Sequence, residues 1–548
     1  MTNRNKRKYS ANRNRGNSQK GNRVPSKFKD MDQKGNNDSG NKWDSIKDGS
    51  LNDLSWYNKI PELLEATARV SFPYRPGRTI KDGVSGVIVD SKESTIEANI
   101  EIPGIMTLDW YPSFGASKDV TDPVSIAASE IYARVRSKYS GSLDADAPDF
   151  IMYLGALDSI FSYIAALKRI YRVLNAYTPD NYVLPDGVLH AMGFTENNRA
   201  VLRANKADLL YAINELVAMS RKFITPGVLD LFNRHYWMND HCYSDDSTIS
   251  SQFYIFRQIG FYMFGLLPIP SNPSVKAGSL IMQNAPWITK KNTSVLDLYN
   301  YGKTLMNALS ASDDAYTISG YLMRAYEGEP TFVVDMLQPE ESFEVSFVPE
   351  VLTQIENSFT IGQYSPDDTN VVSNFGDLNV YQEPNTNTIQ SSAIINGGAC
   401  VVGPRDTFSQ TLSLRSAVPD YGEVAIATRL KAAWKSIDDE IHVISGTELP
   451  YSWSLTYKSD TEWRSVPVNS VMTINERAFE SSSGYAYENL LAISYLSMFD
   501  WAPLVRTFIY SNEAVDKITP ISGIIGDVHN LTVLSQELLQ QIHRVCIF

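Results

Sequence analysis

The chain of 548 residues has little cysteine and no long uninterrupted apolar segment. Its cysteines lie far apart in the sequence, at Cys242, Cys400 and Cys546. Three cysteines at such distances cannot build the disulfide framework of a small secreted domain, which favours a reducing compartment. The apolar run from Phe261 stops at Pro268, and the run from Phe150 contains Asp158. Since a membrane-spanning helix needs about 20 consecutive apolar residues, we expect no stable membrane insertion.

The sequence also lacks the short motifs that most often carry enzyme chemistry. It has no phosphate-binding P-loop, no dinucleotide-binding glycine loop, no His-Glu-x-x-His motif and no nucleophile elbow. Only six histidines occur in the whole chain, and Gly397-Gly398 is better explained as a turn than as a phosphate cradle. We therefore predict that the protein is not an enzyme and that it binds no cofactor.

One segment gathers residue types that can bind metal: His235, Asp240, His241, Cys242, Asp245 and Asp246. Their spacing matches no standard zinc pattern, because a second Cys or His pair is missing. We predict a packed aromatic segment over residues 234–238 followed by a polar loop, with no metal. Two further acids, Asp158 and Glu215, fall on apolar helices. Each is either an acid with a raised pKa or, as is more common, a residue that is paired, capping or at a helix edge.

Charge is distributed very unevenly along the chain. Asp and Glu outnumber Lys and Arg by 62 to 49, which gives a formal net charge of −13. Residues 1–50 nevertheless carry thirteen Lys and Arg against five acids, so their net charge is +8 and that of the remaining 498 residues is −21. Opposite charges on two segments of one chain are typical of an interaction tail. The acidic remainder argues against a nucleic-acid groove in the body, although ordinary solubility charge would give the same count.

The first 50 residues are predicted to form a disordered basic arm. Asn, Gly, Ser, Lys and Arg dominate there, and the few apolar residues cannot offset the entropy of ordering the segment. Residues 1–29 contain ten basic residues and no acid, and a flexible cationic chain binds a phosphate polymer without reading its sequence. The predicted RNA-binding residues are Arg4, Lys6, Arg7, Lys8, Arg13, Arg15, Lys20, Arg23, Lys27 and Lys29. The alternative is a generic tail or a nuclear-localisation signal.

Helical patterns dominate the next part of the chain, up to about residue 330. Asp122 and Pro123 begin a helix that ends before Ser140, since Asp is a good N-cap and Pro fits the first helical position. Pro148 begins a second helix, whose apolar residues recur with helical periodicity over about seven turns. A third helix is expected over residues 206–224.

Residues 331–475 are predicted to be rich in β-strands. Turn residues separate short β-forming runs at 343–348, 388–395, 410–414, 423–428, 440–444, 452–457 and 470–474. Helices are expected within this region at 349–357 and 429–436. Helical patterns then return, and the last helix, over residues 533–545, has one apolar face. The sequence therefore predicts an α+β fold in which a β-rich part is inserted into a mainly helical body.

The stretch from Ile102 to Gly193 resembles the capsid protein of picobirnaviruses. The resemblance rests on short sequence motifs that occur in a fixed order, at residues 103–106, 123–128, 131–132, 135–136, 140–141, 147–149, 153–154, 158–159, 168–171 and 191–193. It continues at residues 234–238 and 351–357, so that it covers about half of the chain. Residues 358–475 show no match of this kind.

The resemblance implies a structural protein of a double-stranded RNA virus. Its expected parts are a disordered basic arm over 1–50, a mainly α-helical shell domain over 51–330, a β-rich protruding domain over 331–475 and a C-terminal helical return to the shell domain over 476–548. It further implies dimers that assemble in the host cytoplasm into the icosahedral shell of the virion, around the RNA genome and the viral polymerase. The alternative is an RNA-binding nucleoprotein or an accessory subunit of an RNA-processing complex. The acidic body counts against a nucleoprotein, which needs a basic groove along RNA.

Overall fold

The computed structural model describes residues 60–71, 76–77, 79–85, 97–178, 182–247, 251–289, 293–361, 377–395, 408–437, 440–459, 462–475, 485–510 and 521–548. The chain divides into two compact units, Met1–Pro73 and Tyr74–Phe548. Of the first unit the structure describes one short helix, α3 (Pro61–Thr67). Its proline lies in the first turn, where a missing N–H leaves no hydrogen bond unmade. The predicted basic arm lies outside the described residues.

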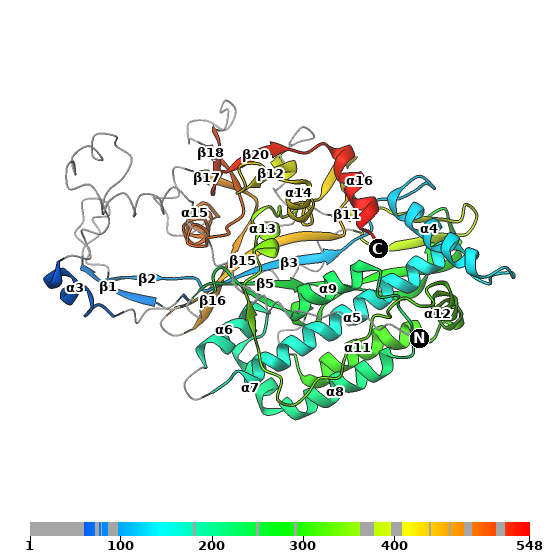
Figure 1. The fold of residues 1–548 in the computed structure, drawn as a ribbon, viewed down its shortest axis with the longest axis horizontal. Helices are drawn as coiled ribbons and strands as arrows, with labels where there is room; N and C mark the ends of the chain where they lie inside the picture. The colour runs from blue at the N-terminus through cyan, green and yellow to red at the C-terminus, as the bar shows by residue number, and fades with distance from the viewer. Residues whose placement is uncertain are drawn as a thin grey trace, which may run out of the picture. The chain divides into compact units, whose positions relative to one another are not determined.

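The core of the second unit is a long helix, α5 (Ala147–Asn175), which is buried along almost its whole length. Its start is fixed locally, because Asp149 accepts a hydrogen bond of 2.7 Å from the backbone N–H of Asp146 in a capping box, with Pro148 in the first turn. By length and composition this helix could cross a membrane, but its whole apolar window is buried among other elements of the unit. It is therefore a core helix, packed among the other helices on its side of the β3–β15 sheet (Figure 1).

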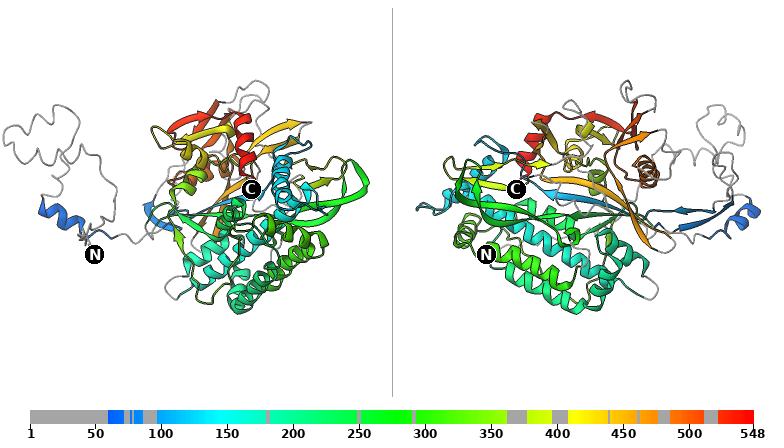
Figure 2. Two further views of the ribbon diagram at one scale, coloured as in Figure 1. Left: turned by 45° about the vertical axis from the view of Figure 1, so that its right-hand side comes forward. Right: turned by 180° about the vertical axis from the view of Figure 1, so that it is seen from behind.

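Further helices surround α5. They are α4 (Pro123–Lys138), α6 (Val183–Ala191), α7 (Glu196–Ala204), α8 (Lys206–Ser220), α9 (Asp230–Asp240), α10 (Pro286–Thr289), α11 (Val295–Ser310) and α12 (Asp313–Ala325). Direct packing on α5 involves α4, α8, α9 and α11 among them. Figures 1 and 2 show α5, α8 and α11 side by side, as one layer of the unit.

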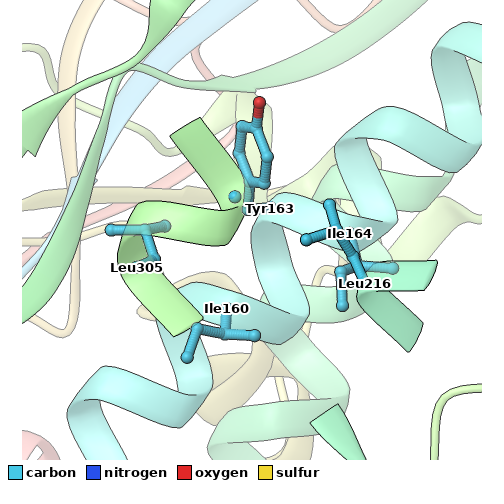
Figure 3. Close-up of a pocket in the computed structure, with 6 residues that line it drawn as sticks. Ile160, Tyr163, Ile164, Leu216 and Leu305 are labelled. Carbon is cyan, nitrogen blue, oxygen red and sulfur yellow. The ribbon is translucent and has the colours of Figure 1, made fainter. Parts of the chain in front are cut away.

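This layer is tightly packed where α5, α8 and α11 meet. Figure 3 shows side chains of all three helices, among them Tyr163, Leu216 and Leu305, around a space that is too small to hold a water molecule. Gly302 of α11 makes this approach possible. A Cβ at its position would lie 2.7 Å from Leu216 Cδ1 and 2.9 Å from Tyr163 Cε1. The helices therefore approach to a distance that only glycine allows here.

A six-stranded sheet lies against the helical layer, in the order β16-β15-β3-β5-β4-β8. Its strands are β3 (Ile105–Pro112), β4 (Cys242–Ser244), β5 (Phe253–Gln258), β8 (Val345–Ser346), β15 (Glu448–Lys458) and β16 (Trp463–Val468). The pairs β3–β5 and β4–β8 are parallel and the other neighbours are antiparallel. All eight residues of β3 are buried, as expected for a strand covered on both faces. In Figure 1, α5, α8, α9 and α11 lie on one side of β3 and β15, and α13 to α16 lie on the other.

Smaller sheets complete the second unit, in the orders β10-β9-β7-β6, β11-β14-β13, β12-β20, β17-β18-β19 and β1-β2. Their strands are β1 (Thr79–Ser85), β2 (Glu97–Glu101), β6 (Gly260–Ile269), β7 (Asn272–Asn284), β9 (Val380–Glu383), β10 (Thr388–Ser391), β11 (Ile394–Ile395), β12 (Thr411–Leu414), β13 (Ala433–Ile437), β14 (Glu440–Ser445), β17 (Val471–Asn475), β18 (Val505–Tyr510), β19 (Ile521–Ile525) and β20 (Asn530–Val533). The remaining described helices, which follow β8 in the chain, are α13 (Pro349–Glu356), the single-turn 3-10 helix η3 (Phe408–Gln410), α14 (Tyr421–Ala427), α15 (Tyr485–Leu496) and α16 (Gln536–Cys546).

The α+β fold class is confirmed, and so are the predicted starts of α4 and α8 and the helix at 349–357. The helix predicted from Pro148 begins one residue earlier, and the third helix ends at Ser220 rather than near 224. Strands occur as predicted within 388–395, 410–414 and 440–444. The domain boundaries at residues 330 and 475 stay a prediction, and β15 of the predicted β-rich part pairs along its length with β3 of the predicted helical part.

Four local predictions are wrong. The run at 423–428 lies in helix α14, because Asp420 accepts a hydrogen bond of 2.8 Å from Glu423 N–H and caps that helix. The predicted helix at 429–436 is a turn followed by β13, which pairs with β14. The last helix begins only at Gln536, after β20. The predicted helical body also contains strands that were not predicted, among them β3 and β5.

Candidate functional site

A cluster of buried charged side chains joins the helical layer to the sheet. Asp158 comes from α5, Arg234 and His235 from α9, Arg429 from the turn after α14, and Glu448 from the start of β15. His235 Nδ1 lies 2.6 Å from Asp158 Oδ2, and its Nε2 lies 3.3 Å from Glu448 Oε1. Glu448 also binds Arg234 Nε at 3.1 Å and Arg429 Nη2 at 3.1 Å. Five side chains from distant parts of the sequence thus form one connected network.

The electrostatics of the cluster favour the charged forms of His235 and Glu448. Burial by itself lowers the pKa of His235, but the carboxylates of Asp158 and Glu448 outweigh it and raise that pKa. Burial raises the pKa of Glu448, but Arg429, Arg234 and His235 outweigh it and hold that pKa well below its usual range. Buried charges are tolerated when they are paired in this way.

The pairing of His235 with Asp158 has the geometry of a general base and the acid that orients it. A catalytic arrangement of this kind needs a hydroxyl or thiol nucleophile next to the second ring nitrogen. Here that nitrogen faces the Glu448 carboxylate, which is itself held by two arginines. The cluster therefore supports packing of the layers and offers no acyl-transfer chemistry.

The chain's C-terminus is tied to the same cluster. Arg234 Nη2 donates a hydrogen bond of 2.9 Å to the carbonyl of Cys546, at the end of α16. On α16 itself, His543 Nε2 lies 3.1 Å from the carbonyl of Phe114, and its Nδ1 accepts a hydrogen bond of 3.2 Å from Gly446 N–H. Ile547 is fully buried. The last helix is therefore a fixed part of the fold, beside α4 in Figures 1 and 2.

The residues considered as metal ligands serve separate structural contacts. Asp240 binds Arg172 Nη1 at 2.5 Å, and Asp245 accepts a hydrogen bond of 3.0 Å from Gln252 N–H. Cys242 is buried in β4, and burial raises the pKa of its thiol to about 12. Among the residues that the structure describes, no three His, Cys, Asp or Glu side chains come together as a metal site.

Glu215, the other acid noted in the sequence, accepts a hydrogen bond of 2.5 Å from the hydroxyl of Tyr299 on α11. It is thus a paired residue, and the same holds for Asp158. Each partner comes from a different element, so the pairing follows from the packing of α5, α8, α9 and α11.

Two hollows open on the surface of the helical layer. One, of about 450 Å³, has Tyr211 of α8 and Leu296 of α11 in its apolar wall and Asp208 and Glu215 as its acids. The other, of about 460 Å³, lies beside the β6–β7 hairpin and α12. Both volumes are within the range of small-molecule sites. Neither lining contains a histidine or a cysteine, so neither hollow holds a nucleophile paired with an imidazole base.

The predicted RNA-binding residues, from Arg4 to Lys29, all lie outside the described residues. The structure therefore places none of them, and their role stays a prediction.

Comparisons with known proteins agree on one family. The family model of the picobirnavirus capsid protein matches residues 56–438. A capsid protein precursor of human picobirnavirus is 23% identical over 528 residues, which cover 91% of each chain. The X-ray crystallographic structure of the picobirnavirus capsid superposes with a TM-score of 0.69 at 21% identity, over 90% of this chain and 97% of that chain. Since the family model spans well over half of the sequence, the chain belongs to the picobirnavirus capsid protein family.

Proposed function

We propose that the protein is a capsid subunit that assembles through dimers into an icosahedral shell around a double-stranded RNA genome. The observation that carries this proposal is the similarity to the picobirnavirus capsid structure over 90% of this chain and 97% of that chain. Identical subunits commonly associate with closed symmetry, as a shell requires. The expected location is the virion, after assembly in the host cytoplasm, and the role is structural rather than catalytic.

Electron microscopy of the purified full-length protein tests this proposal. We expect closed shells of uniform size. Monomers, or filaments bound to RNA, would contradict it and would favour the RNA-binding nucleoprotein instead. The hydrolytic activity of assembled shells on generic ester and phosphoester substrates is a second readout, and we expect it to stay at the background of a buffer control.

The basic arm is proposed to hold RNA inside the shell, together with an enclosed viral polymerase. The support is the charge difference between residues 1–50, at +8, and the other 498 residues, at −21. A cationic arm releases condensed counterions from RNA, while a wall of like charge leaves the RNA free to slide.

Three forms of the chain separate arm charge from arm length. They are the full chain, a deletion of residues 2–40, and a full-length variant in which the ten basic residues of 1–29 are replaced by Gln. RNA content per particle should fall by a similar factor in the deletion and in the Gln variant. Equal RNA content in all three forms would rule out the tether.

Residues 331–475 are proposed to form the protruding domain, with 51–330 and 476–548 as the shell domain. Glu440, whose side chain is 53% exposed, tests this arrangement. A Glu440→Cys variant should react with a bulky maleimide in intact particles as fast as it does after disassembly. A residue reactive only after disassembly would show that this part of the chain does not protrude.

A further inference from the structure

The strand β20 presents a free, apolar edge. In the described part of the chain it pairs only with β12, in a two-stranded antiparallel sheet. All four of its residues are exposed, including Leu531 at 43% and Val533 at 54%, whereas β12 is buried. An exposed edge strand without charged side chains is a template for pairing with another chain.

The direction of the backbone groups of β20 can be read from its ladder. Leu534 N–H donates a hydrogen bond of 3.0 Å to the carbonyl of Gln410. Inward and outward positions alternate along an antiparallel ladder, so the N–H and C=O of Thr532 also face β12. Those of Leu531 and Val533 consequently face the free edge.

The edge is held in place and has an apolar surrounding. His529 N–H donates a hydrogen bond of 3.1 Å to Ser413 Oγ at one end, and the buried Leu534 anchors the other. Asn530 Nδ2 lies 3.4 Å from the carbonyl of Ala417, which places the loop before α14 beside the strand. This loop and the start of α14 carry Val418 and Tyr421, which at 86% and 94% are the most exposed large apolar side chains of the described residues.

We propose that β20 is a contact between subunits, in which the strands of two copies pair antiparallel about a two-fold axis at Thr532. This arrangement puts Leu531 of one copy opposite Val533 of the other, so the outward N–H and C=O groups of both strands satisfy each other. The occupant is a second copy, because an uncharged strand can pair with itself without placing like charges opposite each other. The proposal rests on the proposed self-assembly of the chain, and it adds the surface that mediates it.

A cysteine at the axis gives the first test, in the full-length protein. At the unbonded positions of an antiparallel pair the two Cα atoms are about 4.5 Å apart, which a disulfide can bridge. Thr532→Cys should therefore give disulfide-linked dimers on mild oxidation, above the level of the native cysteines in the unmodified chain. Leu296→Cys, at a position of α11 that is also exposed, is the control. Dimers no more abundant than in that control would overturn the proposal.

A pair of charge variants gives the second test. Leu531→Lys with Val533→Lys places like charges opposite each other across the axis, and shell formation should be lost or need at least tenfold more protein. Leu531→Lys with Val533→Glu places opposite charges there and should assemble as the unmodified chain does. Assembly of both variants, or equal failure of both, would overturn the proposal. Because the cysteine test reads dimers, it can succeed even if no shells form, which separates this contact from the proposed function.

Discussion

Removal of the Glu448 charge should destabilise the subunit more than a change at the surface. The Glu448 side chain is 2% exposed and lies within 3.3 Å of Arg234, Arg429 and His235. The arginines hold its pKa well below the usual range despite burial, so the side chain is a carboxylate throughout the neutral pH range. Glu448→Gln would leave buried cations without their partner, and breaking a buried ion pair costs about 3–5 kcal/mol.

Chemical denaturation of unassembled subunits, followed by tryptophan fluorescence, measures this loss. Glu440→Gln is the control, because Glu440 is 53% exposed and lies 3.8 Å from His442, and such surface pairs contribute about 0–1 kcal/mol. Combining Glu448→Gln with Arg429→Met should cost less than the sum of the two single changes, because it removes both partners together. A loss below about 1 kcal/mol for Glu448→Gln would refute the view that this network joins the layers.

Three further predictions concern other parts of the second unit. Gly302→Ala should lower the melting temperature, because the added methyl group overpacks the contact between the helices at a cost of about 1–3 kcal/mol. Gly320→Ala is the control: its added methyl group meets no atom within 4 Å, and alanine is favoured over glycine within a helix such as α12, so the melting temperature should stay the same or rise. Burial lowers the pKa of His543 to about 4, below the value of about 6.5 that the side chain has in the unfolded chain. The neutral His543 therefore contributes its full stability to the folded state above about pH 6.5, and this stability is lost as the pH falls toward 4, because the unfolded chain binds the proton first. Between about pH 4 and 6.5, the unfolding free energy of the His543→Gln variant should therefore rise less steeply with pH than that of the unmodified chain, with a slope smaller by the equivalent of up to one bound proton. An unchanged slope would contradict the assignment. Asp420→Ala should lower the unfolding free energy by about 0.5–2 kcal/mol through the lost cap of α14, and no change would speak against that cap.

Helix starts were the features that the sequence predicted best, because their signals are local. Pro123 in the first turn of α4 and Asp149 at the third helical position of α5 each act within one turn, whereas the carboxylate of Asp122 accepts hydrogen bonds from the N–H groups of Lys118 and Asp119 before the helix and does not cap it. The same rule was missed at Asp420, where Glu423 completes a capping box and the apolar residues that follow were interpreted as a strand. That error came from weighing β-forming residues above a cap signal that was present in the sequence.

The missing strands have a different cause. β5 begins with four apolar or aromatic residues, and a short run of this kind has no period that identifies a strand, whereas β3 does alternate between apolar and polar residues from Met106 to Trp110, a strand signal that is present in the sequence. Its partners β5 and β15 come from distant parts of the chain, and their pairing depends on the fold as a whole. The sequence could name the residue types of such a sheet but not its neighbours.

The buried cluster shows the same limit for a site. Asp158 and His235 were both noted in the sequence, as a possible perturbed acid and a possible ligand, but 77 positions separate them. Glu448 carried no local signal, and 214 positions separate it from Arg234. Only the packing of α5 and α9 against β15 unites them, so the sequence could predict a paired Asp158 and a packed segment around His235 but not that these two side chains are each other's partners.

The distribution of charge in the fold sharpens the argument about the acidic body. Among the described residues the buried side chains include five acids and five Lys or Arg, whose formal charges cancel when His is counted as neutral. Several are directly paired, as in Asp109 with Arg257 at 2.6 Å. The excess of acid over base in residues 51–548 therefore does not arise from the described core, and where it lies on the surface it is free to act on a phosphate polymer.

Two explanations of this surface charge make different predictions. If the charge serves only solubility, its position on the shell does not matter for RNA. If the wall repels RNA, removing acids from the RNA-facing surface should increase the RNA binding of the assembled shell. Glu→Gln and Asp→Asn changes at exposed positions, compared as inner and outer sets in arm-deleted particles, would separate the two: only the inner set should change RNA content if the wall repels RNA.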